Sequence, residues 1–113
     1  MKIGNINISR DWGWAPDYVE AMYLILQQEN PDDYIIATGK TISLKDFIKI
    51  TFDYFGLNYK DFIIVDKSLL RPSDILISKA DNSKAKKILG WQPTKDIENV
   101  IKEMIEFQLK IKN

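Results

Sequence analysis

The chain has 113 residues, of which 28% are charged and 45% hydrophobic, and its 16 basic residues balance 16 acidic ones. This length suits one domain, and a compact chain of this size buries about 65% of the surface that its unfolded form exposes. The balanced charge gives no overall electrostatic reason to bind nucleic acid or an anionic membrane. The absence of cysteine and histidine excludes disulfides, thiolate or imidazole metal sites, and catalytic groups built on either residue.

Residues 1–10 lack the charged start and long apolar stretch of a secretory leader, and no apolar run approaches a membrane span. We therefore expect a cytoplasmic protein. Loosely alternating isoleucines in residues 1–9 predict a short strand or an extended arm. The segment has no turn or linker before it, which is typical of a piece of a larger fold.

The first helix is predicted over residues 16–29. Pro16 suits a first helical turn because its missing N–H would be unpaired there. Asp17 and Glu20 lie near the positive end of the helix dipole. Apolar residues cover more than one face, which indicates burial on several sides: Val19, Met22, Tyr23, Ile25 and Leu26.

Residues 34–38 form a short β-rich run that ends at Gly39, and they predict a buried strand. Gly39-Lys40-Thr41 matches the end of a phosphate-binding P-loop, but that motif needs a glycine where Tyr34 stands. A strand-to-helix turn, with Ser43 capping the next helix, explains the segment better.

Three further helices and a second strand follow. Ser43 with Asp46 resembles a capping box, the apolar spacing predicts a helix over 44–55, and Gly56 ends it. Residues 62–65 predict a strand. Helices are predicted over 81–90, with a glycine stop, and over 96–111, with one apolar face. Together these elements predict one α/β domain over residues 1–113, with four helices and two or more short strands.

The chain lacks the motifs of short-chain dehydrogenase chemistry. In such an enzyme, Tyr-x-x-x-Lys lets a lysine lower the pKa of a tyrosine for proton transfer, and no tyrosine here has a lysine four residues later. A dinucleotide site needs glycines clustered between a strand and a helix, whereas the five glycines here are scattered. We therefore expect no catalytic residue, no metal site and no cofactor site in this chain.

Arg10 and Arg71 are the only arginines in a chain that otherwise uses lysine. A guanidinium can hold a phosphate or carboxylate through two parallel hydrogen bonds. From the residues alone, an ordinary surface ion pair is the more frequent role for each. The three tryptophans could stack on a base, but large aromatics near helix ends more often belong to the core: Trp12, Trp14 and Trp91.

Several segments resemble GDP-mannose 4,6-dehydratases, which are extended short-chain dehydrogenases. The resemblance runs through Gly4–Gly13, Asp17–Met22 and Ile36–Gly39, and it continues through Arg71-Pro72 and Asp81–Pro93. It covers the chain in order and corresponds to the C-terminal third of such an enzyme. The resemblance implies a small sugar-nucleotide domain without its NADP-binding Rossmann half.

The resemblance also implies an activity for the intact enzyme. Family members oxidise GDP-mannose at C4, remove water across C5–C6 and return the hydride, using NADP. Here Gly4, Asn5 and Arg10 would border the GDP moiety, and Arg71 with Asp74 would close on the nucleotide. Better-known members tend to have Glu at the Asp74 position, so its reach is in question.

The sequence leaves three functions open. The first is a GDP-sugar-binding region, without catalysis of its own, that works with a Rossmann-domain partner chain. The second is a protein-interaction module, or a remnant, that keeps the fold. The third is part of a related GDP-deoxyhexose reductase or epimerase. Apolar surface left bare by the missing half favours self-association, so we expect a homo-oligomer.

Overall fold

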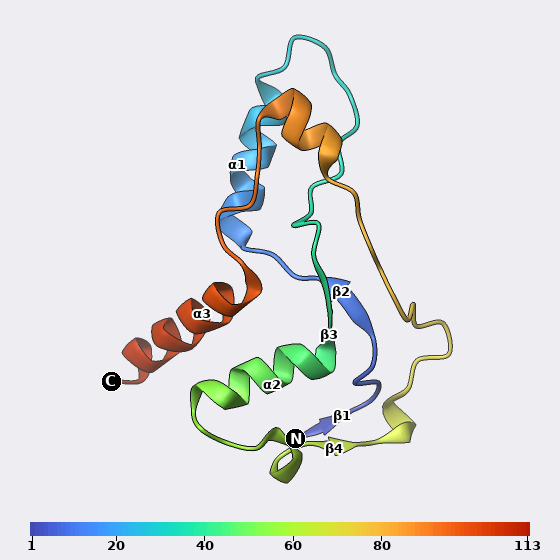
Figure 1. The fold of residues 1–113 in the computed structure, drawn as a ribbon, viewed down its shortest axis with the longest axis vertical. Coiled ribbons are helices and arrows are strands. Elements are labelled where there is room, and N and C mark those ends of the chain that lie inside the picture. The colour runs from blue at the N-terminus through green and yellow to red at the C-terminus, as the bar shows by residue number, and fades with distance from the viewer.

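The computed structural model describes all 113 residues as a flat molecule measuring 52 × 40 × 18 Å (Figure 1). Its radius of gyration is 16.9 Å, whereas a compact domain of this length has about 13 Å. Its accessible surface of 8409 Å² likewise exceeds the about 6400 Å² of a compact monomer with this mass. The chain therefore forms an open layer, with less burial than its length allows.

The four predicted helices are confirmed in position. Three are α-helices and one is a short π-helical turn that ends at Gly90 with φ +65°: α1 (Ala15–Leu26), α2 (Leu44–Tyr54), the turn Ala85–Leu89, and α3 (Ile97–Lys112). Ser43 caps α2 by accepting a hydrogen bond from the N–H of Asp46 at 3.0 Å. The Asp46 carboxylate accepts from the Ser43 hydroxyl, so this pair departs from a full capping box.

The strands form two separate two-stranded sheets. β1 (Lys2–Ile3) pairs in parallel with β4 (Ile64–Val65), and β2 (Ser9–Asp11) pairs antiparallel with β3 (Thr41–Ser43). The strands predicted in residues 1–9 and 62–65 are thus confirmed, although each is shorter than expected. The predicted strand over 34–38 is wrong, because this segment runs without a neighbouring strand to pair with.

The upper core joins α1 to the π-helical turn and to Trp91. Ala21, Ala85, Leu89 and Trp91 form one buried cluster, and Trp91 is only 2% exposed, which confirms its expected core role. The expectation that α1 is buried on several sides is wrong. Four of its apolar side chains remain between 58% and 80% exposed, because the cluster covers only one face: Val19, Met22, Tyr23 and Leu26.

Asp17 ties α1 to the chain that leads into α3. Its carboxylate accepts hydrogen bonds from the Thr94 N–H at 2.9 Å and from the Thr94 hydroxyl at 2.6 Å. Its backbone carbonyl accepts from the indole N–H of Trp91 at 2.7 Å. Asp17 is 6% exposed, so it does far more than favour the start of a helix.

A second, lower cluster lies between α2 and α3. Ile48 of α2 is buried, as are Val100 and Ile101 of α3, and the ring of Trp12 packs on Phe47 with centroids 5.0 Å apart. No helix of the structure is long and apolar enough to cross a bilayer. The fold is thus two small cores connected by extended chain, the arrangement that Figure 1 shows from top to bottom.

Removing the Asp17 carboxylate should destabilise the packing of α1 against the segment that leads into α3. In Asp17→Ala, the N–H of Thr94 loses a partly buried charged partner, so we expect a loss of about 2–3 kcal/mol in unfolding free energy. Urea unfolding followed by tryptophan fluorescence measures this. The exposed Glu20 on the same helix supplies the control, and Glu20→Ala should change stability by less than about 0.5 kcal/mol. Equal effects of the two variants would contradict the linking role of Asp17.

Candidate functional site

The residues singled out in the sequence meet where the loop 66–78 runs along β1 and β2. Ser9 pairs with this loop through its N–H, which donates to Leu76 at 2.7 Å, and through its carbonyl, which accepts from Ser78 at 3.0 Å. The loop begins where the Asp66 carboxylate caps the turn Lys67–Leu69. The hydroxyl and N–H of Ser68 lower the pKa of Asp66, so it stays ionised at neutral pH. The loop is therefore held at both ends.

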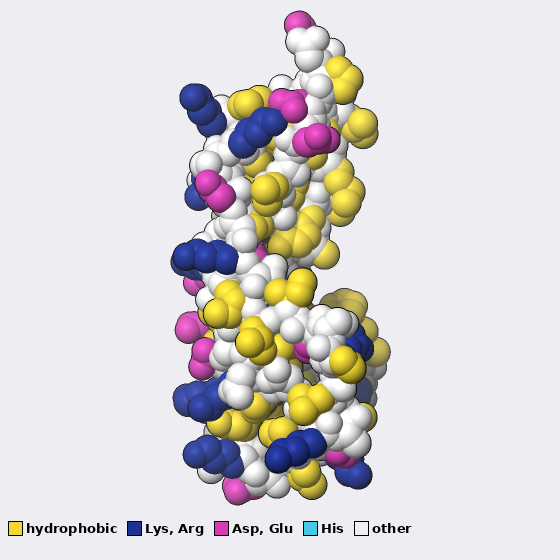
Figure 2. Space-filling view, turned by 90° about the vertical axis from the view of Figure 1, so that its right-hand side faces the viewer, with side chains coloured by type: hydrophobic (Ala, Val, Ile, Leu, Met, Phe, Trp, Pro, Cys, Tyr) yellow, Lys and Arg dark blue, Asp and Glu magenta, His cyan; other side chains and the backbone are white.

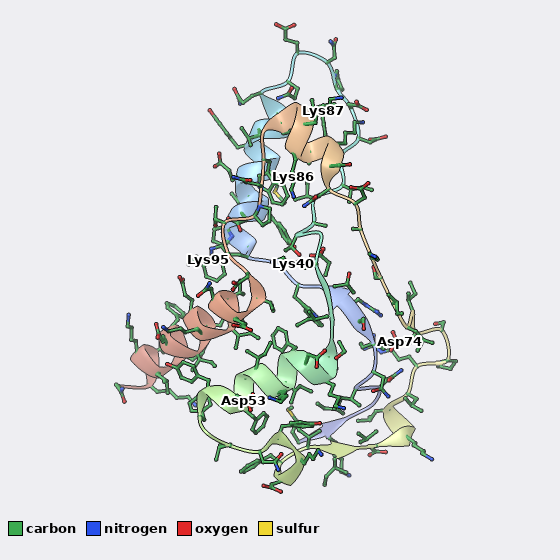
Figure 3. The ribbon with its side chains drawn as sticks, viewed as in Figure 1. Lys40, Asp53, Asp74, Lys86, Lys87 and Lys95 are labelled. Carbon is green, nitrogen blue, oxygen red and sulfur yellow. The ribbon has the colours of Figure 1, made fainter.

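Arg10 extends from β2 and grips this loop. One guanidinium nitrogen donates to the carbonyl of Ile75 at 2.6 Å and to that of Ser9 at 2.8 Å. The other forms an ion pair with Asp74 at 3.1 Å (Figure 3 marks Asp74 beside β2). Both side chains are about one quarter exposed. The structure thus gives Arg10 the ion pair that its residue type most often forms, and its partner is another of the candidate site residues.

Arg71 stands at the start of a tight turn. The N–H of Asp74 donates to the Arg71 carbonyl at 3.3 Å, with Pro72 in the position that suits such a turn. The Arg71 side chain is exposed and forms no hydrogen bond or ion pair within the chain. The turn therefore brings the backbone of Arg71, whose side chain is free of partners within the chain, close to that of Asp74. The short Asp74 side chain reaches Arg10 without difficulty.

Gly4 and Asn5 complete the group. A side chain at Gly4 would place its Cβ 2.6 Å from the carbonyl oxygen of Leu69, so only glycine lets the loop pack against this backbone. The Asn5 side chain accepts a hydrogen bond from the N–H of Asn7 at 2.9 Å, which shapes the turn between β1 and β2. Gly4 therefore lets the loop pack against the backbone that follows β1, and Asn5 shapes the turn beside it.

The turn at Gly39 binds a carboxylate of the chain itself, that of Asp11. Asp11 accepts hydrogen bonds from the N–H and hydroxyl of Thr38 and from the N–H of Gly39, at 2.8–2.9 Å. These N–H groups are the ones that a P-loop would direct at phosphate, and here a carboxylate already holds them. Gly39 has φ +81° and leads into β3, not directly into a helix. This excludes a P-loop.

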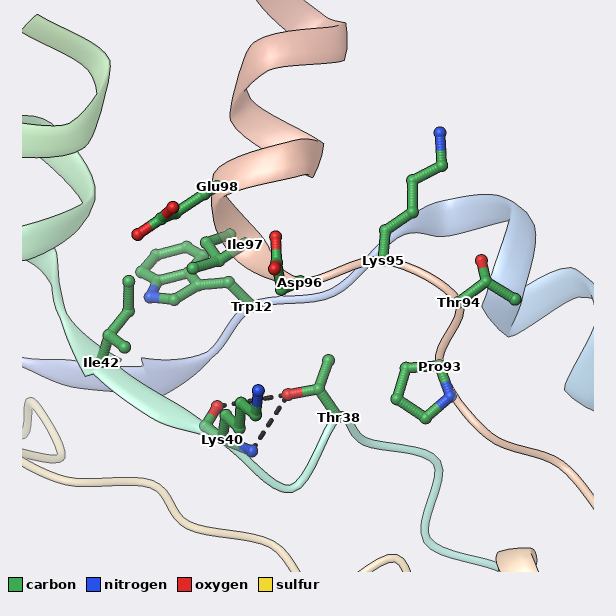
Figure 4. A pocket seen from close by; sticks show the side chains of 10 residues that line it. All are labelled: Trp12, Thr38, Lys40, Ile42, Pro93, Thr94, Lys95, Asp96, Ile97 and Glu98. Atoms are coloured by element: carbon green, nitrogen blue, oxygen red, sulfur yellow. Dashed lines mark hydrogen bonds between the residues drawn. The ribbon is translucent and has the colours of Figure 1, made fainter. Parts of the chain in front are cut away.

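A cavity of about 360 Å³ lies on the opposite side of β2, between β3 and the start of α3 (Figure 4). Trp12 forms part of its wall, and the indole N–H of Trp12 is buried without a partner. None of the five candidate residues lines this cavity. Sequence reasoning missed it, since its walls come from three separate segments and carry no shared motif: Trp12, Thr38, Lys40, Ile42 and Pro93–Glu98.

The residues present do not fit NADP. The five glycines are scattered along the chain at positions 4, 13, 39, 56 and 90, and none of the strands is followed by a glycine-rich loop into a helix. Tyr18 does not supply the missing catalytic phenol. Burial raises the pKa of Tyr18, and the carboxylates of Asp11 and Asp17 raise it further, whereas catalysis needs a lowered value.

Comparison with known structures defines the class of fold. MoeE5, solved in complex with UDP-glucose and NAD, superposes with a TM-score of 0.86 at 21% identity. The superposition covers 100% of this chain and 38% of that one. The whole chain accordingly has the fold of one part of this larger protein.

Sequence comparison narrows the class to one family. A family model described as GDP-mannose 4,6 dehydratase matches residues 1–104. GDP-mannose 4,6 dehydratase 1 of Arabidopsis thaliana is 49% identical over 109 residues, which are 96% of this chain and 30% of that protein. The human GDP-mannose 4,6 dehydratase is 32% identical, over 98% of this chain and 34% of its own length. The chain belongs to the GDP-mannose 4,6-dehydratase family and spans about a third of the length of these relatives.

The Arg10–Asp74 pair should contribute measurably to the position of the loop. Because both side chains are partly exposed, we expect a coupling energy of about 0.3–1 kcal/mol between Arg10→Ala and Asp74→Ala in a double-mutant cycle. The measurement is urea unfolding of the four proteins. The coupling should fall further in 1 M salt, which screens exposed charges. Strict additivity of the two substitutions at low salt would contradict a direct interaction.

Proposed function

We propose that this chain is the GDP-sugar-binding region of a GDP-mannose 4,6-dehydratase-like protein, without catalytic activity of its own. One observation carries the proposal: Arg10, fixed by Ile75 and Asp74, lies against the same turn that presents the unpartnered Arg71. Two arginines with a shared loop are suited to the oxygens of a diphosphate.

The charges at this site favour an anion. Arg10 and Arg71 against Asp74 leave a net charge of +1, and Arg10 uses three of its possible hydrogen bonds on protein partners. A guanidinium carries five N–H groups, so donors remain for a ligand. In this proposal Arg10 orients the diphosphate, and Arg71 closes on it from the loop. Gly4 lets the loop lie close to the backbone after β1, and Asn5 shapes the turn that borders it.

The sugar chemistry belongs to the rest of the fold. Oxidation at C4 and loss of water need a tyrosine, a lysine and a nicotinamide cofactor, and the glycines and tyrosines here do not supply them. The GDP-sugar assignment rests on the names of the relatives, and a related GDP-deoxyhexose reductase or epimerase is the nearest alternative. In either case the present chain holds the substrate and does not transform it.

A second candidate function is a protein-interaction module. The bare apolar face of α1 favours it, since soluble monomers seldom leave such a row of side chains in water. The two functions differ in one property. A nucleotide site requires Arg71 to contribute to binding of GDP, whereas an interaction module gives that side chain no such role.

Calorimetric titration of the full chain with GDP and with GDP-mannose tests the nucleotide site. We expect binding that weakens at least about tenfold in Arg71→Ala, which corresponds to the loss of about 1.4 kcal/mol. Because Arg71 has no partner in the chain, the unfolding free energy of Arg71→Ala should equal that of the unaltered chain. Lys49→Ala is the matched control, since it removes a positive charge from α2, where Lys49 pairs only with Asp53.

Arg10→Ala should weaken GDP binding as well, and it should also reduce stability, because Arg10 anchors the loop. Absence of binding by the unaltered chain at millimolar GDP would overturn the proposed site. Equal losses of GDP affinity in Arg71→Ala and Lys49→Ala would mean that GDP is held only by nonspecific electrostatic attraction.

A further inference from the structure

Asp11 follows Arg10 in β2, and its carboxylate holds the strand from the side opposite to the 66–78 loop. One carboxylate oxygen accepts hydrogen bonds from the N–H and the hydroxyl of Thr38 at 2.9 and 2.8 Å, and the other accepts from the N–H of Gly39 at 2.8 Å. Hydrogen bonds to an ionised acceptor are shorter and stronger than those between neutral groups. Three such bonds therefore fix the side chain directly after Arg10.

The turn that Asp11 binds is itself held in the fold. Gly39 has φ +81°, a left-handed conformation that residues with a side chain rarely adopt. Just before it, the side-chain amide of Asn82 donates a hydrogen bond to the carbonyl of Ala37 at 2.7 Å, and Asn82 is only 6% exposed. Asp11 therefore attaches β2 to a turn whose own backbone is held by further contacts.

The direction of the Arg10 side chain depends on how β2 is rotated about its own axis. β2 and β3 pair over only three residues, with Arg10 opposite Ile42 and Asp11 opposite Thr41. A two-stranded pair of this length is weakly held by its backbone alone. Because neighbouring side chains of a strand point to opposite sides, a rotation that moves the Asp11 carboxylate also moves the Arg10 guanidinium. The bonds at Asp11 therefore limit the directions that Arg10 can take.

The charge of Asp11 separates positioning from electrostatic attraction. On the face of the molecule in Figure 2, acidic and basic side chains are interspersed, so that face offers no broad positive surface to an anion. A carboxylate next to an arginine opposes an anionic ligand by Coulomb's law alone. Removing the charge of Asp11 should then strengthen the binding of a diphosphate, whereas loss of positioning should weaken it. The two effects have opposite signs.

We propose that Asp11 is a positioning residue of the diphosphate site, which acts through Arg10 and does not itself contact the ligand. Its three hydrogen bonds to Thr38 and Gly39 hold β2 in the rotation that directs the Arg10 guanidinium toward the 66–78 loop. The proposal rests on the nucleotide-binding function proposed above, because the ligand whose binding it affects is the diphosphate of a GDP-sugar.

Asp11→Asn tests the sign of the effect. The amide keeps the size of the side chain but replaces one acceptor oxygen by an NH₂ group, which cannot accept the bonds that Thr38 or Gly39 donates. Calorimetric titration of the full chain with GDP should show binding weakened by about fivefold or more. Unchanged or tighter binding would overturn the proposal.

Asp96→Asn is the matched control for the lost charge. It also removes one negative charge, and an asparagine can cap α3 as the Asp96 carboxylate does when it accepts from the N–H of Asn99 at 2.9 Å. Its GDP affinity should stay within about twofold of that of the unaltered chain. Equal weakening in Asp96→Asn and Asp11→Asn would contradict a specific role of Asp11.

The Arg10→Ala background tests whether Asp11 acts through Arg10. In this background Asp11→Asn should change GDP affinity by less than about twofold, since no guanidinium remains to be positioned. The unfolding free energy in urea should still fall, because the bonds to Thr38 and Gly39 are lost in either background. A purely structural role predicts the same loss of affinity with and without Arg10, and that result would overturn the proposal.

Thr38→Val is a milder variant for the case that Asp11→Asn does not fold. Valine has the shape of threonine but lacks the hydroxyl that donates to Asp11 at 2.8 Å and accepts from the N–H of Lys40 at 3.1 Å. GDP binding should weaken by about twofold to fivefold in the chain with Arg10 and stay unchanged in Arg10→Ala. Weakening of the same size in both backgrounds would again contradict an action through Arg10.

Nuclear magnetic resonance of the ¹⁵N-labelled arginines gives a readout without nucleotide. In the unaltered chain the guanidinium N–H groups of Arg10 should exchange slowly, because they are bonded to Asp74 and Ile75. In Asp11→Asn they should exchange faster, whereas those of the exposed Arg71 should not change. Slow exchange that persists in Asp11→Asn would overturn the positioning of Arg10 by Asp11.

These measurements separate the two proposals. If the unaltered chain does not bind GDP, the proposed function is lost, and the arginine spectra still decide whether Asp11 positions Arg10. If the unaltered chain binds GDP and Asp11→Asn binds it equally well, the proposed function stands and only the role of Asp11 is lost.

Discussion

The fold depends on one buried carboxylate. Asp17 joins α1 to the segment that leads into α3, because both of its oxygens accept hydrogen bonds from Thr94 while its carbonyl holds the indole of Trp91. A charge with 6% exposure is tolerated only where hydrogen bonds replace water, and Thr94 supplies two of them. This contact connects the upper half of the molecule to the segment that leads into the lower half.

In the proposed site, Arg10 would serve both the structure of the loop and the binding of a ligand. Arg10 is fixed by its own loop before any ligand arrives, so little side-chain entropy remains to be lost on binding. Arg71, by contrast, is exposed and has no partner within the chain, so the two arginines differ in how far the fold fixes them.

Local signals in the sequence predicted those features that depend only on neighbouring residues. Ser43 at the start of α2 and Gly90 at the end of the π-helical turn are examples, because caps and left-handed stops act within a few residues. The strand at 34–38 was wrong because a strand needs a partner, and none is present in this chain. The role of Asp17 was also missed, since Thr94 lies 77 residues away. For Arg10 the residue type indicated an ion pair or a phosphate, but no pattern indicated Asp74 as its partner.

The two adjacent residues Arg10 and Asp11 give β2 an electrostatic polarity across its width. Successive side chains of a strand point to opposite sides, so the guanidinium reaches the 66–78 loop while the carboxylate fills the Gly39 turn. Two adjacent residues of one short strand therefore fix two segments that lie far apart in the sequence, the 66–78 loop on one side and the turn before β3 on the other.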